Sequence, residues 1–264
     1  MSEAAGRLYE DLESVYDGLW GAARHHGWWI EGGESPEQAR RNLQGEIARM
    51  LAAHQGQSVL DIGCGGGEVG RFLEKAAGVV VSGVSLTAVE GRRAAQGLSG
   101  EVWVGDWAMW QGGARFEGLL ALESLSHMAD GDAFFQKCLQ AGVPTARLLV
   151  ADWFRAEDIS YFERGLLALL ARSGAVVWRE VGEVERASAD AWALREKKEL
   201  GDEVARTWTA MWWRALGAWR RPCLLRALWR AARQRPLLLF APFCARLAYA
   251  TGALRYELLL FERK

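Results

Sequence analysis

Cysteine and proline are scarce in this sequence of 264 residues, which contains four cysteines and five prolines. The cysteines show no C-x-x-C spacing and no paired framework, so we expect neither disulfide bonds nor a metal site. They stand at positions 64, 138, 223 and 244. Such cysteine usage is typical of a reducing compartment, and we expect a cytoplasmic protein.

Long uncharged apolar runs are also missing. No apolar stretch of about 18 residues lacks a charge, so the sequence predicts no membrane-spanning helix. Residues 1–11 are polar and acidic, which is unlike a signal peptide. The formal net charge of −1 lacks the basic excess of a dedicated nucleic-acid binder. With 50% hydrophobic and 25% charged residues, the chain is expected to form a globular protein with a sizeable core.

Glycine, in contrast, is concentrated after one short apolar run. Residues 59–67 read Val-Leu-Asp-Ile-Gly-Cys-Gly-Gly-Gly. Because glycine lacks Cβ, this turn can adopt positive φ angles and let a ligand lie against the main chain. A helix predicted from about Glu68 to Lys75 would offer its unpaired N–H groups to that ligand.

Two classes of cofactor bind to such a turn. The dinucleotide pattern G-x-G-x-x-G is met by Gly65, Gly67 and Gly70. It also requires an acid about 20 residues later, at the end of the next strand. Residues 79–86 contain no acid, which disfavours a dinucleotide. Asp61 instead completes a D-x-G-x-G-x-G pattern, which is typical of the second class of cofactor site. A purely structural tight turn, with no ligand, is the remaining alternative.

Segments suited to strands alternate with helical stretches over most of the chain. Ser35, Pro36 and Gln38 form an N-cap, a first-turn proline and a capping-box partner for a helix that extends to about Ala53. The predicted strands are residues 58–62, 79–84, 102–104, 118–122, 147–151 and 175–179. Helices are predicted between most of them, centred near Phe72, Arg92, Phe135 and Leu167. This alternation predicts an α/β fold with a doubly wound, mainly parallel sheet.

Several motifs together resemble those of class I S-adenosylmethionine (SAM)-dependent methyltransferases. The D-x-G-x-G-x-G turn is similar to their first motif, and residues 83–87, Gly-Val-Ser-Leu-Thr, resemble a stretch of the tocopherol, sterol, prenyl-diphosphate and cyclopropane-fatty-acid branch. Residues 25–29, His-His-Gly-Trp-Trp, are similar to a segment that precedes the first motif in tocopherol-type members. Residues 123–128, Glu-Ser-Leu-Ser-His-Met, resemble their acceptor-side loop. Residues 249–256 are similar to their closing pattern Y-x-x-G-x-x-R-Y.

The resemblance implies a seven-stranded Rossmann-like sheet with N-terminal helices and a helical insertion before the last strand. Residues 1–54 would be an N-terminal helical lid and substrate segment, and residues 55–184 the SAM-binding core. Residues 185–250 would be a helical substrate cover rich in Arg and Trp, and residues 251–264 the final strand.

SAM is the cofactor that the resemblance implies. The expected cofactor-binding residues are Asp61, Gly63, Cys64, Gly65, Gly67, Ser85, Leu86, Asp106, Trp107 and Leu122. Asp106 would accept the adenine amino group, and Trp107 would pack near the base. The alternative is that Asp106 caps the next turn while Trp107 fills the core.

Glu123 and His127 are the candidate catalytic residues. Methyl transfer from a sulfonium is an in-line displacement, so the protein mainly aligns the acceptor and removes its proton. If a helix begins after the strand at 118–122, the i to i+4 spacing puts both side chains on one face. Glu123 would then act as base or cation stabiliser, with His127 as its partner or as an acceptor ligand. A surface carboxylate and a capping histidine are the alternative.

The aromatic segment near the N-terminus is a candidate lid that excludes water from the reacting sulfonium. The expected lid and substrate residues are Tyr16, His25, His26, Trp28, Trp29 and Trp153. Their rings could also attract a cation. An ordinary packed corner is the alternative for the two histidines.

Acidic residues are absent between Val204 and Tyr256, where arginine and tryptophan are frequent. Arg226, Arg230 and Arg233 share one face of a helix predicted between Pro222 and Pro236. Residues 204–246 therefore predict contact with an anionic membrane surface, an acidic partner within the protein, or recognition of a phosphate. The sequence leaves these three alternatives open.

The resulting prediction is a cytoplasmic methyltransferase that acts on an apolar small molecule, such as an isoprenoid or prenyl-quinol, with carbon as the favoured acceptor atom. An O- or N-methyltransferase of secondary metabolism is one alternative. A SAM-binding partner subunit without catalytic activity is the other.

Overall fold

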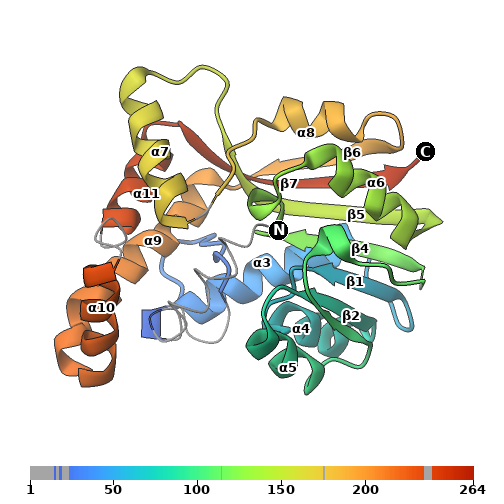
Figure 1. Ribbon diagram of the computed structural model, residues 1–264, viewed down its shortest axis with the longest axis horizontal. Helices are drawn as coiled ribbons and strands as arrows, with labels where there is room; N and C mark the ends of the chain where they lie inside the picture. The colour runs from blue at the N-terminus through green and yellow to red at the C-terminus, as the bar shows by residue number, and fades with distance from the viewer. Residues whose placement is uncertain (1–14, 16–17, 20–23, 114, 175, 235–239) are drawn as a thin grey trace.

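The computed structural model describes residues 15, 18–19, 24–113, 115–174, 176–234 and 240–264. A seven-stranded sheet in the order β3-β2-β1-β4-β5-β7-β6 forms its centre (Figure 1). The strands are β1 (Ser58–Ile62), β2 (Val80–Ser85), β3 (Val102–Val104), β4 (Phe116–Leu122), β5 (Gly142–Arg155), β6 (Trp192–Glu199) and β7 (Leu254–Arg263). Neighbouring strands are parallel except for β7, which runs antiparallel to β5 and β6. The predicted doubly wound, mainly parallel sheet is confirmed.

Helices cover both faces of this sheet. They are α3 (Pro36–Met50), α4 (Glu68–Ala77), α5 (Ala88–Ala95), α6 (Gly131–Ala141), α7 (Tyr161–Gly174), α8 (Val181–Ser188), α9 (Gly201–Leu216), α10 (Pro222–Gln234) and α11 (Ala241–Ala250). Short 3₁₀ turns include η1 (Trp107–Met109), η2 (Leu125–His127) and η3 (Gly217–Arg220). The predicted start of α3 is correct, because the Ser35 side chain accepts a hydrogen bond from Gln38 N and Pro36 occupies the first turn.

Two hydrophobic clusters lie on opposite faces of the sheet, because successive residues of a strand point to opposite sides. In β4, Leu120 and Leu122 pack against the cluster that includes α3, α4, α9 and α11. Leu119 and Ala121 pack against the cluster that includes α6 and α8. Both faces of the central strands are therefore buried, which explains why these strands read as continuous apolar runs.

The strand order reverses between β1 and β4. β1 is followed along the chain by β2 on one side, whereas β4 leads to β5 on the other. In open α/β sheets, a crevice forms at such a point beyond the carboxyl ends of the strands. The glycine turn after β1 and the Glu123 segment after β4 both lie at this end, so the topology alone brings them together.

The sixth strand differs from the prediction. Residues 176–179 are not in a strand, and residue 175 lies outside the described residues. The sixth strand in chain order is β6, which lies within residues 185–250, a range predicted to be helical. β6 is an edge strand with the sequence Trp-Ala-Leu-Arg-Glu-Lys-Lys-Glu. Its charged residues are typical of an exposed edge strand. Because they interrupt any apolar run, apolar runs alone do not predict this strand.

The helices α9, α10 and α11 form the predicted helical insertion before the last strand, and α10 lies farthest from the sheet (Figure 1). None of the helices in the described part of the chain combines the length and the apolar character needed to cross a membrane. The insertion is tied to the N-terminal segment through Thr207 of α9. Its hydroxyl accepts hydrogen bonds from Gly27 N and from Trp29 Nε1, both at 3.1 Å.

We predict that Thr207→Val lowers the free energy of unfolding by about 1–3 kcal/mol, because it leaves two buried N–H donors without an acceptor while keeping the side-chain shape. Urea denaturation measures this change. Thr209→Val, on an exposed position of the same helix, is the matched control and is expected to change stability by less than about 0.5 kcal/mol. Equal effects of the two substitutions would contradict the role assigned to Thr207.

Candidate functional site

The turn after β1 adopts the left-handed backbone conformation that its glycines permit. The φ angles of Gly63, Gly65 and Gly67 are +89°, +51° and +81°. A Cβ on Gly63 would lie 2.6 Å from Cβ of Ser124, which follows β4. The Gly63 and Cys64 N–H groups both donate to the carbonyl oxygen of Val84 at the end of β2. The bend is thus held closely between the ends of its two neighbouring strands.

Two adjoining cavities open over this turn. One has about 570 Å³ of space and the other about 450 Å³. Both are lined by Arg24, Gly63, Gly65, Glu90 and Leu122. The first also contains Ser85, Leu86, Glu123, Ser124 and His127, and the second Asp61, Cys64 and His25. Seven of the ten predicted cofactor residues therefore line one connected cleft.

Asp61 is a buried carboxylate at the floor of this cleft, with 3% of its surface exposed. Burial raises the pKa of Asp61 to about 7. No ion pair between described residues involves Asp61. The Ser85 hydroxyl, also at the cleft, is buried without a hydrogen-bond partner among the described residues. A cationic ligand with its own donors would satisfy both groups, so the cleft fits the ammonium end of SAM.

Arg24 and Glu90 form an ion pair at the cleft. Nη1 of Arg24 lies 2.9 Å from Oε1 of Glu90, which belongs to α5. The other carboxylate oxygen of Glu90 lies 2.9 Å from the position that a Cβ on Gly65 would occupy. Although the second strand has no acid, α5 thus supplies a carboxylate beside the glycine turn.

Glu123 lies at the acceptor side of the cleft in an unusual backbone conformation, with a φ of +51°. Its Oε1 accepts hydrogen bonds from His26 N at 2.8 Å and from the Tyr256 hydroxyl at 2.9 Å. Its Oε2 lies 2.9 Å from Nδ1 of His26. Burial alone would raise the pKa of Glu123, but the His26 imidazole and its hydrogen bonds outweigh this effect and hold the pKa below its usual value. Glu123 is therefore ionised at neutral pH.

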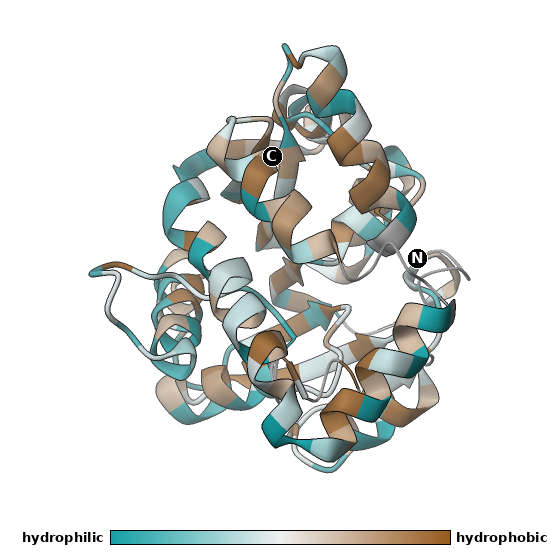
Figure 2. Cartoon of the chain, turned by 90° about the vertical axis from the view of Figure 1, so that its left-hand side faces the viewer, coloured by the Kyte–Doolittle hydropathy of each residue, from teal (hydrophilic) through white to brown (hydrophobic). Residues whose placement is uncertain are grey.

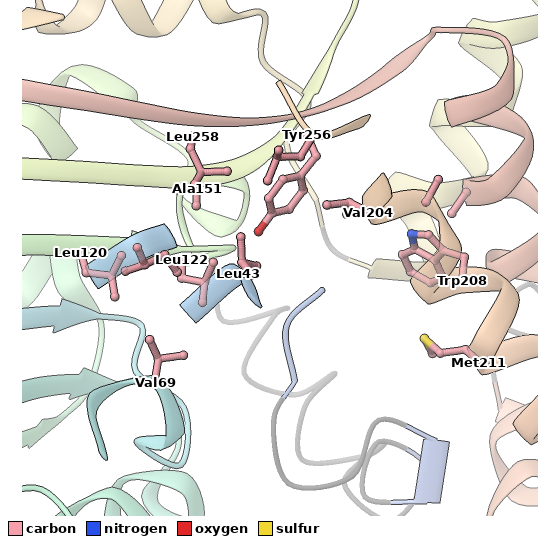
Figure 3. Close-up of a cluster of buried hydrophobic side chains, with 14 of the residues drawn as sticks. Leu43, Val69, Leu120, Leu122, Ala151, Val204, Trp208, Met211, Tyr256 and Leu258 are labelled. Atoms are coloured by element: carbon pink, nitrogen blue, oxygen red, sulfur yellow. The ribbon is translucent and has the colours of Figure 1, made fainter. Parts of the chain in front are cut away.

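The His26 imidazole fills an aromatic cluster. Its ring centroid lies 5.2 Å from that of Trp153, 5.3 Å from that of Trp208 and 5.4 Å from that of Tyr256. Trp153 and Trp208 also stack on each other, with an interplanar angle of 17°. Tyr256 from β7 and Trp208 from α9 belong to the same hydrophobic cluster as Leu122 and Ala151 (Figure 3).

A second buried carboxylate, Asp152, lies behind the aromatic cluster. It accepts hydrogen bonds from Ser126 N and Trp153 N, both at 2.9 Å. Burial raises the pKa of Asp152 to about 7 despite these bonds. The Trp153 indole N–H donates to the Ser126 hydroxyl at 2.9 Å. Asp152 therefore fixes the backbone on which Trp153 and His127 are carried.

The condition that a helix begins after β4, on which the shared face of Glu123 and His127 rested, is not met. The backbone of Glu123 has a left-handed conformation, and the 3₁₀ turn η2 follows it instead of an α-helix. The carboxylate of Glu123 is directed to His26, which is 97 residues away in the chain. Glu123 and His127 nevertheless line the same cavity. Their catalytic roles stay a prediction.

Three predicted cofactor residues do not line the cleft. Gly67 caps the N-terminus of α4. Asp106 accepts a hydrogen bond from Ala108 N and caps η1, while Trp107 is buried and stacks on Trp110 at 5.1 Å. These are the capping and packing roles that the sequence left as the alternative, and the adenine contact stays a prediction.

The lid residues divide between cleft and core. His25 lines the cleft, and burial lowers its pKa. Trp28 lies beneath Lys198, whose Nζ is 4.0 Å from the ring centroid. Trp29 is buried and bonded to Thr207. Tyr16 lies outside the described residues.

Several residues of the site were not found from the sequence, among them Arg24, Glu90, Thr207 and Trp208. Arg24, Thr207 and Trp208 reach the site from distant segments, so no local spacing reveals them. Glu90 could have been found from its position four residues after Leu86, in the first turn of a predicted helix. Side chains in a helix are directed toward its N-terminus, which here lies near the glycine turn.

Comparison with known proteins gives one family match, to a methyltransferase domain, over residues 36–215. The chain is 31% identical over 157 residues to 27-O-demethylrifamycin SV methyltransferase of Amycolatopsis mediterranei, with 56% of this chain and 57% of that protein covered. It is 29% identical over 174 residues to a probable chloroplastic tocopherol O-methyltransferase of Oryza sativa subsp. japonica, with 58% and 47% covered. The chain thus spans about half the length of these curated relatives.

A solved structure of similar fold is that of a mycolic acid cyclopropane synthase complexed with SAH and CTAB. Its TM-score is 0.86 at 12% identity, with 98% of this chain and 96% of that chain covered. This likeness extends over the sheet and the helical insertion alike.

We predict that Asp61→Asn stabilises the ligand-free protein at pH 8 by about 2–4 kcal/mol. The pKa of Asp61 is raised from 3.8 to about 7 on folding. The folded state therefore holds the proton more tightly, and this contribution to stability is lost as the pH rises from about 4 to above 7. Asparagine carries no charge at any of these pH values.

Thermal unfolding between pH 5 and pH 8 tests this prediction, with a gain in stability that is larger at pH 8 than at pH 5. Asp132→Asn, at an exposed position of α6, is the matched control. A gain that does not change with pH would contradict a buried, ionising Asp61.

Proposed function

Because this chain belongs to the methyltransferase domain family, we propose that it is a SAM-dependent methyltransferase acting on an apolar small molecule. The observation that carries this proposal is the cleft at the sheet reversal. It joins the glycine turn and Asp61, which has no ion pair among the described residues, to the Glu123–His26 pair. A cation-binding end and an acid–base end thus share one space.

The residues around the glycine turn would hold the cofactor. Asp61 would accept the ammonium group, and the Ser85 hydroxyl would gain the partner that it lacks. Glu90 is a candidate for the ribose hydroxyl groups, because its carboxylate lies beside Gly65. SAM, when bound, supplies a methyl group on a sulfonium sulfur for in-line displacement. The acidic side chains of the cleft suit this cationic molecule.

On the acceptor side, Glu123 and His127 would orient the acceptor and receive its proton. Both line the cavity next to Leu122 and Ser124. Glu123 is ionised and held by His26 and Tyr256, so its position is fixed before an acceptor binds. Trp153 and Trp208 pack against the fully buried His26 ring, and this apolar surrounding would strengthen the electrostatic effect of the pair on a reacting group.

The acceptor is proposed to be an isoprenoid, a prenyl-quinol or a related natural product, and the sequence motifs favour carbon as the methylated atom. A hydroxyl oxygen is the second candidate, and one observation favours it. His26 fills the aromatic cluster, so these rings surround an imidazole rather than open space for a carbocation. The two relatives described above also act on oxygen according to their names.

We predict that Glu123→Gln keeps SAM affinity but lowers turnover by roughly tenfold or more, because Gln retains the hydrogen-bond acceptor without the charge. Calorimetry measures the affinity and transfer of labelled methyl the turnover. Glu101→Gln, at an exposed position, is the control and is expected to leave both unchanged. Unaltered turnover in Glu123→Gln would remove this residue from the mechanism.

The acceptor class is tested with methyl-labelled SAM and separate lipid and polar extracts of the source cell. Label is expected in the lipid fraction. Cleavage of the product with hydriodic acid then separates the two candidates, since an O-methyl group leaves as methyl iodide and a C-methyl group does not. Label in the polar fraction alone would contradict an apolar acceptor, and SAM binding without any transfer would favour a non-catalytic partner subunit.

A further inference from the structure

Helix α10 carries a basic aromatic face that the proposed chemistry does not use. Arg226, Trp229, Arg230 and Arg233 follow the i, i+3, i+4, i+7 spacing of one helical face, and all four are exposed. Trp229 exposes 57% of its surface, and Trp213 and Trp219, just before α10, each expose 67%. We call these six residues the Arg/Trp surface. Helices of mixed hydropathy are turned toward the viewer on this side of the molecule (Figure 2).

The opposite face of α10 is buried, which fixes the rotation of the helix about its own axis. Leu224, Ala227 and Ala231 are buried in the main hydrophobic cluster. A Cβ on Gly18 would lie 2.4 Å from Cδ1 of Leu224, so Gly18 packs closely on this face. The Arg/Trp surface is therefore the outward side of a helix that is already docked.

The arginines of this surface have no acidic partner in the described part of the chain. None of the ion pairs between described residues involves Arg226, Arg230 or Arg233. Arg233 lies instead over the Trp229 ring, 3.8 Å from its centroid. Arg220 lies over Trp219 in the same way, at 4.7 Å. The acidic-partner alternative drawn from the sequence thus finds no support in these contacts.

We propose that the Arg/Trp surface docks on a bilayer that contains anionic phospholipid. Tryptophan rings favour the boundary between headgroups and acyl chains, and arginine is attracted by anionic headgroups. Cation–π pairing lets Arg233 remain charged while Trp229 enters the apolar layer. A second copy of this chain would meet the same positive charges, and their repulsion disfavours a dimer through this face.

Helix α9 links this surface to the proposed acceptor site. Trp208, which packs on His26, and Trp213, which belongs to the Arg/Trp surface, are both on α9 and lie five residues apart. If the proposed function holds, docking would bring the acceptor side of the cleft to the membrane in which an apolar acceptor dissolves.

Co-sedimentation of the whole chain with vesicles tests the docking. Vesicles of phosphatidylcholine alone are compared with vesicles containing about 30% phosphatidylglycerol, at low salt and at about 0.5 M salt. Binding is expected only with the anionic vesicles and is expected to weaken in high salt. Equal failure to bind under all conditions would overturn the proposal.

Variants locate the contact. The triple variant Arg226→Ser, Arg230→Ser, Arg233→Ser is expected to weaken partitioning by roughly tenfold or more. The matched control removes the same charge from exposed positions on other helices, Lys75→Ser, Arg92→Ser and Arg172→Ser. Trp229→Ser should also weaken binding, whereas Met109→Ser, exposed near the far edge of the sheet, should not. Equal losses in the variants and their controls would overturn the assignment.

Two further measurements separate the possible outcomes. Sedimentation velocity detects a dimer, and a dimer that Trp229→Ser dissociates would overturn membrane docking in favour of self-association. SAM calorimetry on the triple variant is expected to give unchanged affinity, which also shows that the variant is folded. Vesicle binding without SAM binding would refute the proposed function but not the docking, and the reverse result would refute the docking alone.

Discussion

The charge of Glu123, nearly buried at the edge of the cleft, is the constraint on which the site depends. A buried carboxylate is costly unless it is paired and hydrogen-bonded. His26 supplies an imidazole and a backbone N–H, and Tyr256 supplies a hydroxyl. These partners come from the N-terminal segment and from the last strand, so satisfying one charge joins the two ends of the described chain at β4. Trp153 and Trp208 then pack edge-on against the His26 ring and hold it beside Glu123.

The same charge accounts for the strained backbone at residue 123. A left-handed φ is costly for a residue with a side chain, and such strain persists where surrounding contacts determine it. Residue 123 directly follows β4 and faces the Gly63 turn, where Ser124 already occupies the space that a Cβ on Gly63 would need. The reversed turn at Glu123 sends its carboxylate to His26 while the chain continues into η2. The left-handed conformation of Glu123 thus directs its carboxylate to His26 and also allows Ser124 to lie against the Gly63 turn.

Much of the fold could be predicted from the sequence because its signals are local. β1 and β3 lie where the apolar runs predicted them, and Ser35 and Pro36 mark the start of α3. β6 could not be found in this way, because an edge strand with alternating charge buries only part of one face. In the site, the glycine turn is equally local and was recognised. The Arg24–Glu90 and His26–Glu123 pairs join segments that only the folded sheet brings together, and no spacing in the sequence encodes them.

Two regions of the molecule carry charge of opposite sign, the acidic cleft and the basic helical insertion. Asp61, Glu90 and Glu123 gather around the cleft, where Asp61 has no cationic partner among the described residues. The insertion from α9 to α11 contains no acid after Glu203, and two of its exposed arginines, Arg220 and Arg233, lie over tryptophan rings. If these arginines were surplus charge on a solvated surface, exposed tryptophans beside them would carry only a cost in solubility. The presence of an acidic cleft and a basic helix in one molecule is explained if the cleft binds a cation and the helix contacts an anionic surface. Each region then attracts the ligand that the other region repels.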